Sequence, residues 1–110
     1  MIATWVDPLD RTVLLYEDTW YDHVCVEHPN LHDQIHLVQV TIEHPERINF
    51  DAVFAKHESY YRPVWLAKRR TLMKVSVEFD APDAYDQIVG TVVTAYPTVS
   101  VKQGETRRWP

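Results

Sequence analysis

A small set of side chains in this sequence could move protons or hold an anion. His28 follows an apolar helical stretch, where the end of a helix favours a charged imidazolium. Tyr61 and Arg62 stand side by side, and Lys74 lies in a run of alternating residues. Tyrosine can stack on nucleic-acid bases, and a guanidinium binds phosphate oxygens through two hydrogen bonds. Together these residue types predict a site for a polyanion.

Other kinds of chemistry have weaker support. His32 and His36 have the spacing of two metal ligands on a helix, but no third ligand stands nearby. Cys25 is the only cysteine and lies on an apolar helix face, which predicts a buried structural thiol. Two glycines are too few for a glycine-rich phosphate loop or a dinucleotide fingerprint. We therefore expect neither a metal nor an organic cofactor.

The net charge of −5 is unevenly distributed. Residues 1–55 carry ten acidic side chains and two arginines, whereas residues 56–110 carry nine basic and six acidic ones. The second half could therefore present a basic surface, with Arg62, Lys68, Arg69, Arg70 and Lys74 on one side. The alternative is that the acidic residues only solvate surface helices. The sequence has no signal peptide pattern and no long apolar run, so we expect a cytoplasmic protein without a membrane segment.

The first half of the chain predicts a hairpin and two helices. Two short β-prone runs flank Asp7-Pro8, which favours a turn. A helix should run from Asp18 or Thr19 to about residue 27, and a second from about residue 31 to 43. Both end at a His-Pro pair, since proline pushes the residue before it out of the helical region. The apolar stripe of the second helix is Leu31, Ile35, Val38 and Ile42.

The second half predicts strands at 47–50, 59–64, 71–80 and 86–96. Met73, Val75, Val77 and Phe79 should pack against Val24 and the stripe of the second helix, while Lys74, Ser76 and Glu78 point the other way. Val92, Thr94 and Tyr96 share one side of the last strand. The predicted fold is α+β: a β-hairpin, then two α-helices packed on one face of a four-stranded antiparallel β-sheet. One domain spans 1–110, with a hairpin at 1–17, a core at 18–97 and a tail at 98–110.

Five short segments in this order resemble a known family of small nucleases. They are His28-Pro29-Asn30, Thr41-Ile42-Glu43-His44-Pro45-Glu46-Arg47-Ile48, Tyr60-Tyr61-Arg62, Lys74-Val75-Ser76-Val77 and Thr94-Ala95-Tyr96. The pattern is similar to the barnase–EndoU–colicin–RelE-like nucleases, in particular to their phage- and mobile-element-associated branch. The resemblance covers roughly residues 18–97, and it implies two helices followed by a four-stranded antiparallel sheet.

The resemblance also implies a function, that of a toxin-type endoribonuclease. Such an enzyme cleaves RNA, here tRNA or mRNA, by attack of the 2′-hydroxyl without a metal, and an antitoxin is an expected protein partner. His28 would be the base or acid, Arg62 and Lys74 would hold the phosphate, and Thr94 and Tyr96 would orient it or donate to an oxygen. Secondary candidates for the site are His23, Tyr61 and Ser76.

Two other functions stay open at this point. The chain could be a module of the same fold that binds RNA or protein without cleavage. It could also be an acidic antitoxin-like or immunity-like protein whose N-terminal half docks on a basic target. Convergence of His28, Arg62, Lys74, Thr94 and Tyr96 in one cleft would favour the enzyme.

Overall fold

The alternating side chains of the longest strand determine where the core lies. In the computed structural model, which describes all 110 residues, strand β5 (Arg69–Phe79) buries Met73, Val75, Val77 and Phe79 on one face. Helix α2 (Ile35–Glu43) packs on that face, with Val38 and Ile42 fully buried. The predicted contact between this helix and the apolar side of the strand is therefore confirmed.

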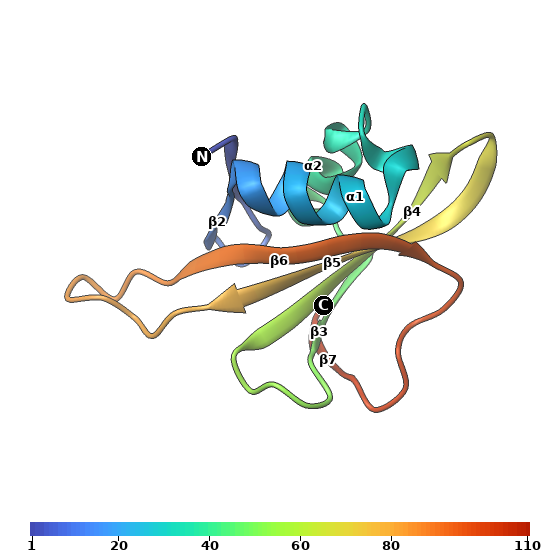
Figure 1. The fold of residues 1–110 in the computed structure, drawn as a ribbon. Coiled ribbons are helices and arrows are strands. Elements are labelled where there is room, and N and C mark those ends of the chain that lie inside the picture. The colour runs from blue at the N-terminus through green and yellow to red at the C-terminus, as the bar shows by residue number, and fades with distance from the viewer.

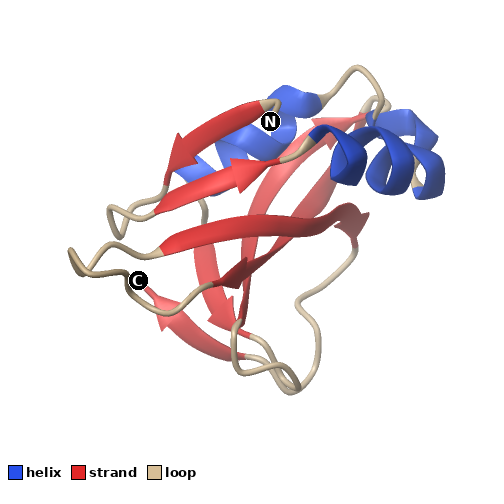
Figure 2. Cartoon of the chain, turned by 60° about the vertical axis from the view of Figure 1, so that its left-hand side comes forward, coloured by secondary structure: helices blue, strands red, loops and turns tan.

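Seven strands form a single mixed sheet, with the helices gathered on one side (Figures 1 and 2). Their order across the sheet is β1-β2-β6-β5-β4-β3-β7. Only β2 and β6 run parallel, and all other neighbours are antiparallel. The remaining strands are β1 (Ala3–Val6), β2 (Thr12–Leu15), β3 (Arg47–Phe50), β4 (His57–Leu66), β6 (Val89–Thr98) and β7 (Thr106–Trp109).

The predicted four-stranded antiparallel sheet is wrong. The N-terminal hairpin is not a separate unit, because β2 pairs in parallel with β6, Val13 lying opposite Gly90. The expected tail is not outside the fold either, because β7 pairs with β3 at the other edge of the sheet. Both additions depend on short strands that meet partners far away in the chain. A period-2 pattern of four residues cannot specify such a distant partner.

The helical region is more broken than the apolar spacing predicts. The first helix consists of a π-helical turn, η1 (Thr19–Val24), followed by a single α-turn, α1 (Cys25–Glu27). A 3₁₀ turn, η2 (Pro29–Leu31), comes next, so α2 begins at Ile35 and not at residue 31. The His-Pro pairs do end both helices, as expected from the restriction before proline. None of the helices has the length and apolarity needed to cross a membrane.

A β-bulge in β6 changes which face of the sheet its side chains point to. Ser76 lies opposite Thr94, but the next residue, Val77, lies opposite Val92, so Val93 is the extra residue. Val92 consequently enters the core, while Thr94 and Tyr96 point to the other side. The prediction that Val92 shares a side with Thr94 and Tyr96 is wrong, because strict alternation assumes that no residue is inserted.

Candidate functional site

The sheet face opposite α2 gathers most of the predicted site residues. In the register of the sheet, Tyr61 and Tyr96 lie on either side of Lys74. One step along the strands, Ser59 and Thr94 lie on either side of Ser76. Residues directly opposite each other in antiparallel strands share a face. We call this side the polar face, and it carries Asn49, Ser59, Tyr61, Lys74, Ser76, Thr94 and Tyr96.

His28 reaches the same group of residues from the helical region. Its imidazole is stacked on the ring of Tyr96, with 5.8 Å between the ring centroids and 21° between the planes. The ammonium of Lys74 lies 5.7 Å from the centroid of the Tyr96 ring. His28 and Tyr96 are only partly buried, so both remain accessible to a ligand. Three segments far apart in sequence therefore meet around Tyr96.

A glutamate from the C-terminal segment completes the polar face. One Glu105 carboxylate oxygen lies 2.8 Å from Lys74 Nζ, and the other accepts hydrogen bonds from Tyr61 OH at 2.7 Å and Asn49 Nδ2 at 3.1 Å. The side chain of Glu105 is completely buried. In Figure 1 the loop that carries Glu105 leaves the end of β6 and leads into β7, the edge strand that pairs with β3. Sequence reasoning missed Glu105, which lies in a segment without hydrophobic periodicity.

The ion pair changes the acid–base properties of its members. Burial lowers the pKa of Lys74, but the hydrogen bonds to Glu105 and Tyr61 more than offset this effect and leave it raised. Burial also raises the pKa of Tyr61, and the hydrogen bond to Glu105 raises it further. Lys74 and Tyr61 therefore stay protonated at neutral pH, and Lys74 is a permanent cation beneath Tyr96.

One buried hydroxyl on the polar face has no hydrogen-bond partner. Ser59 Oγ is fully buried, and Ser59 stands opposite Ser76 in the register. Burying an unpaired hydroxyl costs free energy, so this group destabilises the folded state.

Two of the predicted site residues lie elsewhere. Arg62 stands opposite Met73, on the face that holds the core, and its guanidinium donates to the backbone carbonyl of His44 at 2.6 Å. His23 lies 3.5 Å from Glu27 on the surface of the first helical segment. The predicted single basic side is wrong as well, because Lys74 is buried and Arg62 points away from it.

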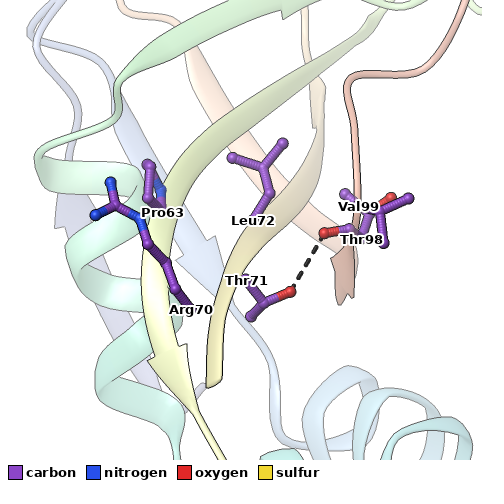
Figure 3. Close-up of a pocket in the computed structure, with 6 residues that line it drawn as sticks. All are labelled: Pro63, Arg70, Thr71, Leu72, Thr98 and Val99. Carbon is purple, nitrogen blue, oxygen red and sulfur yellow. Dashed lines mark hydrogen bonds between the residues drawn. The ribbon is translucent and has the colours of Figure 1, made fainter. Parts of the chain in front are cut away.

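Free positive charge is concentrated instead at the turn between β4 and β5. The strands extend to Leu66 and from Arg69, so the turn has only two residues, shorter than the sequence predicts. Trp65, Lys68, Arg69 and Arg70 are all exposed here, and we call residues 65–70 the basic hairpin. Two surface hollows, of about 320 and 440 Å³, both border Arg70. Figure 3 shows the smaller one, which is lined by Pro63, Arg70, Thr71, Leu72, Thr98 and Val99.

A second buried network lies on the helix side of the sheet. Arg11 bonds to both oxygens of Glu58 at 2.9 Å and to Asp7 at 2.9 Å, and Tyr60 OH donates to Asp7. Burial lowers the pKa of Arg11, but the hydrogen bond to Glu58 and the nearby charges raise it on balance. Every donor in this network is satisfied internally, which indicates a structural role.

The comparisons with known proteins do not assign a family. The chain matches no protein-family model, no curated protein and no solved structure. The residues and their geometry are therefore the basis for assigning a function.

Proposed function

We propose that this protein is an endoribonuclease that binds single-stranded RNA at the partly exposed end of the polar face, around His28, Thr94 and Tyr96, and cleaves it by attack of the 2′-hydroxyl. The observation that supports this most is the meeting of His28, Tyr96 and Lys74. An imidazole, a phenol and a permanent cation lie within one nucleotide's reach of each other. The resemblance of the short segments to small nucleases points in the same direction.

The proposed reaction needs one base and one acid. The imidazole of His28 takes the proton from the ribose 2′-hydroxyl, whose oxygen then forms a bond to the adjacent phosphorus. The bond from phosphorus to the 5′-oxygen breaks, and Tyr96 OH gives that oxygen a proton. The products are a 2′,3′-cyclic phosphate and a 5′-hydroxyl. His28 has then gained one proton and Tyr96 has lost one, and exchange with solvent water returns both groups to their starting state. Such proton transfers typically contribute about 10²–10⁴ to the rate.

The other groups on the polar face act on charge and position. The Lys74 ammonium is buried beneath Tyr96, so it acts on the developing negative charge of the phosphate only through its electrostatic field, which the Glu105 carboxylate reduces. Thr94 and Ser76 stand opposite each other and offer hydroxyl donors next to Tyr96. Arg62 has no part in the proposed site, since it lies on the other face of the sheet.

The test is cleavage of labelled single-stranded RNA in the presence of a chelator. We expect cyclic phosphate ends, and a rate about 10²–10⁴ lower for His28→Ala. Tyr96→Phe keeps the ring against His28 and removes only the hydroxyl, so it should also slow cleavage. His36→Ala is the matched control, because His36 is exposed on α2 and outside the polar face. Equal rates for His28→Ala and the unaltered protein would refute the assignment of His28.

A second candidate function is RNA binding without cleavage. One observation favours it: the charge of Lys74 is already paired with a carboxylate. Arg62 cannot take over the role of Lys74, because its guanidinium is bound to the carbonyl of His44. In that case the same RNA should bind in an anisotropy titration and remain intact after prolonged incubation.

A further inference from the structure

The basic hairpin exposes a large aromatic side chain among cations that have no partner. Trp65 is 70% exposed, whereas Trp5 and Trp20 are buried in the core. No carboxylate lies within 4 Å of Lys68, Arg69 or Arg70, although the buried cations Arg11 and Lys74 both have close carboxylate partners. An exposed indole beside free guanidinium groups is the pairing that single-stranded nucleic acids recognise.

Trp65 and Arg70 lie on the side of the sheet that continues the polar face. They are directly opposite each other in the register of β4 and β5, so their side chains share a face. Along β5 that face carries Lys74, then Leu72, then Arg70. Arg70 and Lys74 are four residue steps apart along the strand, which corresponds to about 13 Å. The hairpin is therefore one or two nucleotides away from Tyr96.

The surface between these two groups is hollow and largely apolar. Pro63 and Leu72 lie opposite each other, with Thr98 on the far side of Leu72. They line the hollow of about 320 Å³, and Figure 3 shows the guanidinium of Arg70 beside Pro63. The hydroxyl of Thr71 is already used, since it donates to the carbonyl of Thr98 at 3.2 Å. The walls are thus free of competing carboxylates and can take a ribose or a base.

We propose that Trp65 and Arg70 form a nucleotide subsite for single-stranded RNA, with the base stacked on the indole and the phosphate bound by the guanidinium. The strand then crosses the Pro63–Leu72 hollow towards Tyr96. An RNA duplex does not fit this arrangement, because its bases are already stacked and paired. The proposal rests on the proposed function for the direction of the strand, but binding at the hairpin can be measured without cleavage.

The experiment uses a fluorescein-labelled, fully 2′-O-methylated oligouridine of about eight nucleotides, which cannot undergo attack by a 2′-hydroxyl. Its affinity is measured by anisotropy for the full chain and its variants. Trp65→Ala should weaken binding about 5- to 100-fold, the range of one base stack, and Trp65→Phe should recover most of the loss. Arg70→Ala should weaken binding and reduce the slope of log K against log salt by about 0.7, as expected for one lost phosphate contact.

Arg69→Ala is the matched control. Arg69 carries the same charge on the same hairpin, but it lies opposite Leu66 and so points to the other face of the sheet. If Arg69→Ala weakens binding as much as Arg70→Ala, the hairpin acts only through its general charge and the subsite is wrong. Unchanged binding by Trp65→Ala, with an unchanged melting temperature, would also overturn it.

Failure of the subsite can be told apart from failure of the proposed function. If the protein binds the oligonucleotide through Trp65 and Arg70 but leaves unmodified RNA intact, the subsite is supported and the nuclease activity is refuted. If Trp65→Ala, Arg70→Ala and the unaltered protein cleave RNA with equal kcat/KM, the nuclease activity is supported and the subsite is refuted. Preferential binding of an acidic peptide over the oligonucleotide would overturn the subsite as a site for RNA.

Discussion

Glu105 shows how one carboxylate can organise a sheet face. It accepts bonds from an ammonium, a phenol and an amide that come from β5, β4 and β3. These donors would otherwise be three unsatisfied polar groups on a surface covered by the C-terminal segment. Their convergence on one carboxylate fixes the position of Lys74 and thereby the charge beneath Tyr96. The Lys74–Glu105 pair therefore positions Lys74 in the site and attaches the C-terminal segment to the sheet.

Removing the Glu105 carboxylate should strongly destabilise the protein. In Glu105→Ala the buried Lys74 charge loses its counterion, and breaking a buried pair in this way costs about 3–5 kcal/mol. Equilibrium urea unfolding at neutral pH measures the loss. The double variant Lys74→Met with Glu105→Leu removes both charges and should recover most of the stability. A loss below about 1 kcal/mol in Glu105→Ala would contradict the buried geometry.

Asp51 makes a pH-dependent contribution at the start of the loop after β3. Its carboxylate accepts backbone hydrogen bonds from Val53 and Phe54, each at 2.8 Å. Burial raises the pKa of Asp51, but these bonds and the charges of Lys102 and His57 lower it below its ordinary value on balance. A lowered pKa stabilises the fold above the ordinary value of 3.8 and loses this effect as the pH falls through the folded-state value.

Asp51→Ala should therefore cost about 1 kcal/mol at neutral pH and less at about pH 3. Urea midpoints at both pH values give the comparison. Asp80→Ala serves as the control, because Asp80 is exposed and its carboxylate accepts no hydrogen bond in the structure. If the loss of stability in Asp51→Ala is larger at about pH 3 than at neutral pH, the pKa of Asp51 is not lowered in the folded state and the explanation is refuted.

Individual site residues could be predicted from the sequence when they lay on an alternating strand. Lys74, Thr94 and Tyr96 do share a face, as hydroxyls and cations on the outer side of the sheet indicated. Tyr61 and Arg62 could not both lie on this face, because neighbouring residues of a strand point to opposite faces. That conflict was present in the sequence itself. Glu105 had no such signal, since only the path of the C-terminal loop brings it to Lys74.

At the level of elements, long periodic segments were predictable and short ones were not. The apolar side of β5 and the stripe of α2 meet as expected. The bulge at Val93 was not predictable from alternation, yet it alone allows Val92 to fill the core while Thr94 faces outward. The two strands of the N-terminal hairpin and β7 have only four residues each, too few for a pattern that identifies a partner.

The turn of the basic hairpin is strained and can be improved. Ala67 and Lys68 have φ values of 51° and 63°, a left-handed conformation that disfavours side chains with a Cβ. Lys68→Gly should therefore stabilise the protein by about 1 kcal/mol. Lys56→Gly is the control at a residue without positive φ, where the same change should destabilise by about 0.5–1 kcal/mol. Thermal unfolding of both variants tests the contrast, and a loss of stability in Lys68→Gly would contradict the turn geometry.

At the scale of the whole molecule, one buried network joins the two ends of the chain to its centre. Arg11 follows the turn of the N-terminal hairpin, Glu58 lies in β4, and Arg108 of β7 donates to the same Glu58 carboxylate at 3.2 Å. The guanidinium of Arg11 also lies 3.9 Å above the ring of Phe79 in β5. Contacts across 47 and 50 residues cannot be deduced from local pattern. This explains why the sequence predicted the two ends as appendages.

Arg11→Met should consequently weaken the whole fold. Methionine preserves much of the buried stem volume but leaves the Asp7 and Glu58 carboxylates without their main counterion, which costs about 3–5 kcal/mol for a buried pair. Urea unfolding followed by tryptophan fluorescence, to which the buried Trp5 and Trp20 contribute, should show one cooperative transition at a lower midpoint. Arg62→Met is the matched control, since Arg62 makes a single hydrogen bond to a backbone carbonyl and should cost about 1 kcal/mol. If Arg11→Met unfolds at the same midpoint as Arg62→Met, the network does not hold the ends of the chain to the sheet.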